Sequence, residues 1–178
     1  MTHYCLDACS LINLFCGWGG IQELHAFGDS WSTSRTALSE FTEVREWCQD
    51  GSIVRRPIDG AAICDGSPLA VHVATGDDEL ATLSRLTMAV DDGEAECLAI
   101  AKHRGLILVS DDGLAVVHAA NEGVPAVSSI QLLAEWSSLD ASRKPRLGEI
   151  ARRVELLARY IPPPQSPHRA WWDTLRAP

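Results

Sequence analysis

Five carboxylates in this sequence stand where buried strands are expected to end or where helices are expected to run. They are Asp7, Glu40, Glu94, Asp111 and Asp112. Carboxylate oxygens that converge from separate elements are the ligands that hydrated Mg²⁺ or Mn²⁺ takes in proteins, whereas Zn²⁺ prefers nitrogen and sulfur. The pattern therefore predicts a divalent-metal site. The metal charge would also offset the repulsion between clustered carboxylates and a polyanionic substrate.

Each carboxylate also has a purely structural interpretation. Asp7 follows the apolar run of residues 4–6 and could cap the helix that comes after it. Glu40 lies beside Leu38 and Phe41 in a helical stretch, where a Glu side chain is usually solvated. For these two residues the sequence alone leaves both interpretations open.

Glu94 has the strongest competing interpretation. The spacing Asp91-x-x-Glu94 is that of a capping box, in which Glu94 returns to its own helix start. At roughly 100° per residue, Glu94 shares a helix face with Leu98 and Ala101, while Glu96 is rotated by about 200°. Only one of the two glutamates can therefore face the site, and we expect it to be Glu94.

Asp111 and Asp112 present a similar ambiguity after the apolar run of residues 106–109. Neighbours on an extended segment face opposite ways, and Asp112 is also a natural N-cap for the next helix. Capping accounts for one of the two acids but not for both.

Short apolar runs alternate with helical patterns along the chain. Strands are predicted at residues 4–6, 31–33, 106–109 and 126–127, and helices at residues 10–15, 21–26, 77–88, 91–103, 112–121 and 130–139. Thr36 predicts a helix to about residue 49, Ser67-Pro68 predicts another, and residues 52–58 are expected to be extended or irregular. This alternation favours a parallel sheet covered on both faces, whose active site lies beyond the carboxyl ends of the strands.

The 178 residues suffice for one domain that buries about 70% of the surface of its unfolded chain. No apolar run approaches the roughly 18 residues of a membrane span, and no signal peptide is visible, so we expect a cytoplasmic protein without membrane contact. The cysteines and histidines lack CxxC and HExxH spacing, which gives no support to zinc or thioredoxin-like chemistry.

Charge divides the chain into an acidic body and a basic tail. Residues 1–140 hold 7 Lys/Arg against 21 Asp/Glu, a net charge of −14, whereas residues 141–178 hold 8 against 3, a net charge of +5. We interpret residues 1–140 as one domain and residues 141–178 as a basic helical extension with a Pro- and Trp-containing end. The extension could pack on the body, form a dimer arm, or contact RNA or an acidic partner.

Four short motifs, taken in order, resemble those of PIN domains, the metal-dependent nucleases that include the VapC-type toxins of toxin–antitoxin modules. They are residues 6–12 (LDACSLI), 39–41 (SEF), 93–96 (GEAE) and 108–112 (LVSDD). The resemblance covers residues 4 to about 136. Two features depart from the family pattern: the third acid is Glu where Asp is commoner, and residues 141–178 extend past the usual end.

The resemblance implies a PIN-like three-layer α/β/α sandwich with a central four- or five-stranded parallel sheet. The residues that would form the catalytic, metal-binding site are Asp7, Glu40, Glu94 and Asp112. Asp111 would be the alternative or additional ligand, and Ser10 would hydrogen-bond Asp7. The family also implies hydrolysis of RNA phosphodiester bonds with Mg²⁺ or Mn²⁺, a homodimer, and inhibition by a cognate antitoxin.

Two other classes of function compete with an endoribonuclease. A catalytically inactive PIN-like regulator would bind nucleic acid or protein, and Asp7→Asn would leave its binding unchanged. A phosphotransferase would use Asp7 as nucleophile, but Cys9 stands where the commonest phosphatase of this kind has its second Asp. The sequence favours the ribonuclease, and it identifies neither the RNA target nor the antitoxin.

Overall fold

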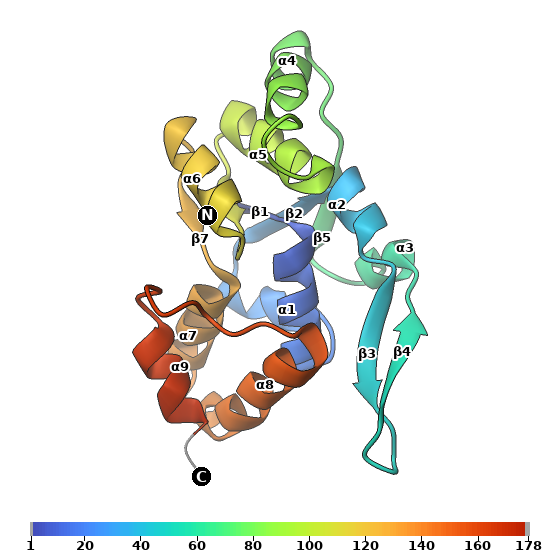
Figure 1. Ribbon diagram of the computed structural model, residues 1–178, viewed down its shortest axis with the longest axis vertical. Helices are drawn as coiled ribbons and strands as arrows, with labels where there is room; N and C mark the ends of the chain where they lie inside the picture. Colours follow the sequence, from blue (N-terminus) through green and yellow to red (C-terminus); the bar gives the residue numbers. More distant parts are fainter. Residues whose placement is uncertain (1, 177–178) are drawn as a thin grey trace.

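The computed structural model describes residues 2–176 and shows an α/β sandwich built on a parallel sheet (Figure 1). Five strands pair in the order β5-β2-β1-β6-β7, all in parallel. They are β1 (His3–Leu6), β2 (Ser30–Ser34), β5 (Leu69–His72), β6 (Ile107–Val109) and β7 (Ala126–Val127). The predicted three-layer α/β/α architecture is confirmed.

Two apolar layers hold this sheet between helices. Leu6 belongs to the layer formed with α1 (Ala8–Trp18) and α7 (Ser129–Leu139), whereas its neighbour Cys5 belongs to the layer formed with α5 (Asp92–Arg104). Successive side chains of a strand point to opposite faces, which accounts for this division. On the α5 side lie α4 (Asp77–Leu86) and α6 (Gly113–Asn121), and both contact α5.

The helix predicted to run to residue 49 is wrong. Helix α2 (Arg35–Glu40) is short, and the chain then forms the antiparallel hairpin of β3 (Glu43–Trp47) and β4 (Ile53–Pro57). Ion pairs between Glu and Arg side chains join the two strands, so pairing with a distant partner overrides the helix propensity of these residues. Figure 1 shows this hairpin projecting from the body. The expectation that residues 52–58 are extended is confirmed.

The helix predicted from Ser67-Pro68 is also wrong, because strand β5 begins there. The Ser67 hydroxyl accepts a hydrogen bond from the Leu69 N–H at 3.2 Å, so the cap-like residue stabilises a turn into a strand. Pairing with β2 fixes the four residues of β5. Such a short apolar run has no periodicity that separates strand from helix. The segment predicted as a helix at residues 21–26 is a 3-10 helix, Gln22–Phe27, and α3 spans Gly60–Cys64.

The C-terminal residues pack against α1. Helix α8 (Leu147–Arg153) continues into a π-helical turn, Val154–Ala158, and α9 (Arg169–Leu175) follows. A Cβ atom on Gly17 of α1 would lie 3.2 Å from both Ile150 and Val154, so glycine permits this close helix contact. Within residues 2–176 no helix is both long enough and apolar enough to cross a membrane.

Candidate functional site

The carboxyl ends of β1 and β6 bring two of the expected acids to one edge of the sheet. The two strands are neighbours, with Leu6 opposite Val109, and Asp7 and Asp112 follow them within three residues. The Asp7 N–H continues the pairing by donating to the Val109 carbonyl at 3.1 Å. Adjacent parallel strands therefore deliver both side chains to the place where sites on such sheets are usually found.

Asp7 caps α1 with only one of its two carboxylate oxygens. Oδ1 accepts the Ser10 backbone N–H at 2.7 Å, which is the capping role, while the Ser10 hydroxyl donates to the Val109 carbonyl and to Asp111. Oδ2 is fully buried and has no hydrogen-bond partner in the described part of the chain. Burial raises the pKa of Asp7 to about 6, the nearby hydroxyls of Ser110 and Ser10 oppose that rise, and the charge of Asp111 adds to it. Among residues 2–176, no donor thus lies within hydrogen-bond distance of Oδ2, although the Ser110 hydroxyl is close enough to lower the pKa of the carboxyl.

Glu94 lies near Asp7 and Asp112. Its pKa is raised to about 7 by burial, then by the charges of Asp112, Asp7 and Asp91, while a hydrogen bond from the Asp91 backbone opposes the rise. That bond is half of the capping box, since the Asp91 side chain makes no cap hydrogen bond in return. Glu94 therefore combines a partial helix cap with membership of an acidic cluster.

Asp112 is the N-cap of α6 and holds its position through one oxygen. Oδ1 accepts the N–H groups of Leu114 at 2.7 Å and Ala115 at 2.9 Å, which leaves Oδ2 for other partners. A pocket of about 420 Å³ is lined by both Asp112 and Glu94. We call Asp7, Glu94 and Asp112 the acidic cluster.

The Cys9 thiol, two residues after Asp7 on α1, responds to this cluster. Its pKa is raised to about 12 by partial desolvation and by the charges of Asp7, Glu94, Asp111 and Asp112, although the side chain reaches the surface. The thiol is therefore protonated at neutral pH and is a poor metal ligand or nucleophile. Its surroundings carry a concentrated negative charge that a cation would relieve.

Glu96 faces another part of the molecule. Its carboxylate is buried and accepts the backbone N–H groups of Thr36 at 2.9 Å and Ala74 at 3.1 Å. These hydrogen bonds lower the pKa of Glu96, although burial acts in the opposite direction. Glu96 thus ties α5 to the start of α2 and to the chain after β5, while Glu94 lies near the other acids.

Glu40 is used differently from the other expected ligands. It is the last residue of α2, and its carboxylate accepts the Gly93 N–H of α5 at 3.0 Å. Its pKa is raised by burial and by the charges of Asp91 and Asp92, against the hydrogen bond from Gly93. A Cβ atom on Gly93 would lie 2.5 Å from a Glu40 oxygen, so the missing side chain gives Glu40 its place. Glu40 is a cap for α5.

Asp111 is held by a hydrogen-bond network. It accepts bonds from the Asn13 amide at 2.8 Å, the Ser129 N–H at 3.0 Å and the Ser10 hydroxyl at 3.4 Å. Burial raises its pKa, and hydrogen bonding by Ser129, Asn13 and Tyr160 opposes the rise. Of the two neighbouring acids, Asp112 is therefore the one with a free oxygen beside Glu94.

Sequence reasoning missed the residues that position Asp111. Asn13 follows Ser10 by three residues, so the two polar side chains share one face of an otherwise apolar helix, and that spacing was a readable signal. Tyr160 comes from the C-terminal extension, about fifty residues away in sequence, and no local pattern connects it with Asp111.

The donor set of the acidic cluster has the chemistry of a hard-cation site. Within residues 2–176 no three or more His, Cys, Asp or Glu side chains are placed so that they could hold a metal ion. The unsatisfied Asp7 Oδ2 and the remaining oxygen of Asp112 are nevertheless carboxylate donors of the type that Mg²⁺ or Mn²⁺ takes.

Comparison of the chain with protein-family models, with characterised proteins and with solved structures found no significant match.

Proposed function

We propose that this protein is a metal-dependent endoribonuclease of the PIN type that hydrolyses RNA phosphodiester bonds and acts as the toxin of a toxin–antitoxin module. The observation that carries the proposal is the buried, unsatisfied Asp7 Oδ2 at the end of β1. Leaving a buried carboxylate oxygen unpaired costs about 1–3 kcal/mol or more, and a cation bound there would remove that cost. The four motifs and their order along the chain support the same proposal.

The acidic cluster would hold the ion. Asp7, Glu94 and Asp112 would supply its protein ligands, and a bound Mg²⁺ or Mn²⁺ would supply positive charge and a water of lowered pKa. Asp112 is oriented by the N-terminus of α6, and Asp7 by the N-terminus of α1. Glu94, whose pKa is raised to about 7, would lose its proton when a cation binds. Glu40 would act through α5, by holding the Gly93 N–H beside Glu94.

A PIN-like regulator without catalysis is the second candidate. It is favoured by the helix-capping bonds of Glu40 and Glu94, which engage carboxylates that a complete metal site would use. Such a protein would bind nucleic acid or a protein partner, and its affinity would be independent of Asp7.

The remaining parts of the proposal concern partners and location. We propose a cytoplasmic homodimer that a cognate antitoxin inhibits by covering the acidic cluster. The acid-rich body, with a net charge of −14 over residues 1–140, would then need either the metal or the basic residues of the extension to admit RNA.

Cleavage of a mixed RNA pool by the purified protein tests the proposal. The reaction is run with Mg²⁺, Mn²⁺ or EDTA, and Asp7→Asn is compared with Asp65→Asn, a matched change at an exposed aspartate. We expect metal-dependent cutting that Asp7→Asn abolishes and Asp65→Asn leaves unchanged. Folded, antitoxin-free protein that cuts with neither metal would instead support the regulator.

A further inference from the structure

A second pocket lies on the other side of Asp112. It has a volume of about 360 Å³ and is enclosed by the first turns of α6, the end of β7 and the C-terminal segment of residues 160–168. Apolar side chains, aromatic and proline rings and a few polar groups line it. Among them are Val116, Val127, Gln131, Tyr160, Pro163 and His168. This combination is typical of a site for a small, flat, partly polar molecule.

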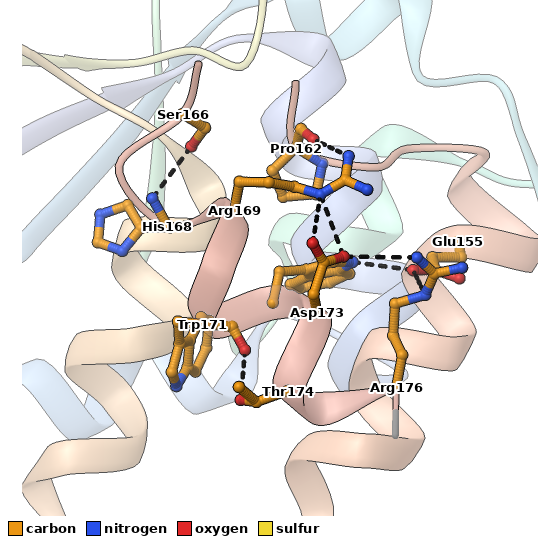
Figure 2. A network of polar contacts seen from close by, with 10 residues as sticks. Glu155, Pro162, Ser166, His168, Arg169, Trp171, Asp173, Thr174 and Arg176 are labelled. Carbon is orange, nitrogen blue, oxygen red and sulfur yellow. Dashed lines mark hydrogen bonds and ion pairs between the residues drawn. The ribbon is translucent and has the colours of Figure 1, made fainter. Parts of the chain in front are cut away.

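The wall made by the C-terminal segment is firmly anchored (Figure 2). The Arg169 guanidinium donates to the Pro162 carbonyl at 2.9 Å and pairs with Asp173 at 2.9 Å. Two backbone bonds close the turn between, from Ser166 to Pro163 at 2.9 Å and from Arg169 to Ser166 at 3.0 Å. The pocket is therefore largely preformed.

Buried contacts hold the C-terminal segment against the rest of the protein. The Trp172 side chain is completely buried, and its indole N–H donates to Glu155 at 2.9 Å. Glu155 also pairs with Arg176 at 2.7 Å, as Figure 2 shows. At the start of the C-terminal segment, Arg159 adopts the left-handed conformation (φ 60°) and turns the chain toward Tyr160.

The pocket borders the acidic cluster at Asp112. Asp112 lines both this pocket and the one that contains Glu94, and Asp111 lines this pocket as well. The Tyr160 side chain, from the C-terminal segment, lines the pocket together with Asp111. A ligand in the pocket would thus lie directly beside a group bound at the acids.

From this placement we propose that the pocket is a subsite for one nucleobase of an RNA strand whose phosphate lies at the acidic cluster. The inference rests on the proposed ribonuclease, and it assigns the C-terminal extension a role in choosing where RNA is cut. Sequence-specific RNA recognition uses unstacked bases that lie against rings and hydrogen-bond through their edges.

The polar groups of the pocket suit a base better than a phosphate. The described lining residues include the acids Asp111 and Asp112 but no Lys or Arg. The pocket would therefore repel a phosphate, but it would not repel a neutral heterocycle. The Gln131 amide nitrogen donates to Glu135 at 2.9 Å, which leaves the amide oxygen to accept from a base. Tyr160, Pro163 and His168 supply flat surfaces for its ring.

Filling the pocket tests the inference with a closely matched control. Val116 lines the pocket and is 39% exposed, while Val117, the next residue of α6, is 56% exposed and lies outside the lining. Val116→Trp would occupy the base position, and Val117→Trp would add the same side chain to the same helix beyond it. Both sites are solvent-accessible, so both variants should fold, which circular dichroism checks.

Binding is measured by fluorescence anisotropy with labelled A6, C6 and U6 hexaribonucleotides and Mg²⁺, in the Asp7→Asn background so that RNA stays intact. We expect the three oligomers to differ in affinity, and Val116→Trp to weaken the preferred one about tenfold, the loss of one stacked base. His168→Ala should weaken it about fivefold. Val117→Trp should change nothing.

Cut positions on a long RNA are mapped in parallel for both Trp variants with Asp7 restored. Altered positions with Val116→Trp alone would support the subsite. Val116→Trp protein that binds the hexamers and cuts at the same positions as Val117→Trp would overturn it, while leaving the ribonuclease intact. Base-dependent binding that Val116→Trp removes, in protein that never cuts, would retain the subsite and refute the ribonuclease.

Discussion

Asp7→Asn should make the folding stability of the metal-free protein less sensitive to rising pH. The folded state raises the pKa of Asp7 from 3.8 to about 6, chiefly because the side chain is buried. Between these two values the folded protein binds more protons than the unfolded chain, so stability falls as pH rises through this window. Above pH 6 the full penalty is present, and well below pH 3.8 it is absent.

The size of this penalty follows from the shift. Two pKa units at 1.36 kcal/mol each correspond to about 3 kcal/mol. The Asn amide would keep the acceptor for the Ser10 N–H, but its buried nitrogen would replace Oδ2 without a partner, at about 1–3 kcal/mol. The cost of this unpaired amide nitrogen is independent of pH. Because about 0.5 kcal/mol of the penalty is already present at pH 4, the difference between variant and wild type should shift in favour of Asn by about 2.4 kcal/mol from pH 4 to pH 7.5.

Urea denaturation in EDTA at a series of pH values measures this difference directly. Asp65→Asn, at an exposed site, serves as the control and should run parallel to wild type at every pH. If Asp7→Asn also ran parallel to wild type between pH 4 and 7.5, then Asp7 would not carry the raised pKa, and the argument for a cation at Oδ2 would fail.

Three further changes test other parts of the site. Mg²⁺ at tenfold its Kd should stabilise wild type by about 1.4 kcal/mol at pH 7.5, and Glu94→Gln should remove most of that gain in thermal melts; an equal gain would exclude Glu94 as a ligand. Gly93→Ala should displace the Glu40 carboxylate and lower the free energy of unfolding in urea by about 1 kcal/mol, but should have no such effect in a Glu40→Ala background. An equal loss of stability in that background would refute the role of Glu40 as a cap of α5. Trp172→Ala should cost about 3–5 kcal/mol, whereas the half-buried Trp171→Ala should cost less, and equal losses would contradict the anchoring role of Trp172.

The strands that carry the acids could be predicted because local signals and tertiary structure agree there. The apolar run before Asp7 is short and ends on a helix-capping carboxylate, and the run before Asp111 has the same form. In a doubly covered parallel sheet such runs have few alternatives. The positions of Asp7 and Asp112 at one sheet edge therefore follow from the sequence.

Other elements depended on partners that no local window contains. Residues 43–47 favour a helix by composition but pair with β4, and β5 takes its conformation from β2. Glu40 could not be oriented from the sequence because α2 ends at that residue, so the helical phase used to place it does not continue. Tyr160 reaches Asp111 only through the packing of α8 on α1.

The packing of the first helix against the last has a consequence for synthesis. The contact of Gly17 with Ile150 and Val154, and the buried Trp172, join residues separated by more than a hundred positions. Chains emerge from the ribosome at about 5–20 residues per second and fold from the N-terminus, so α1 waits several seconds with an apolar face uncovered. The pocket beside Asp112 gains its outer wall only after residues 160–168 have been synthesised. A nascent chain thus carries the acids of its site long before it can hold an RNA base beside them.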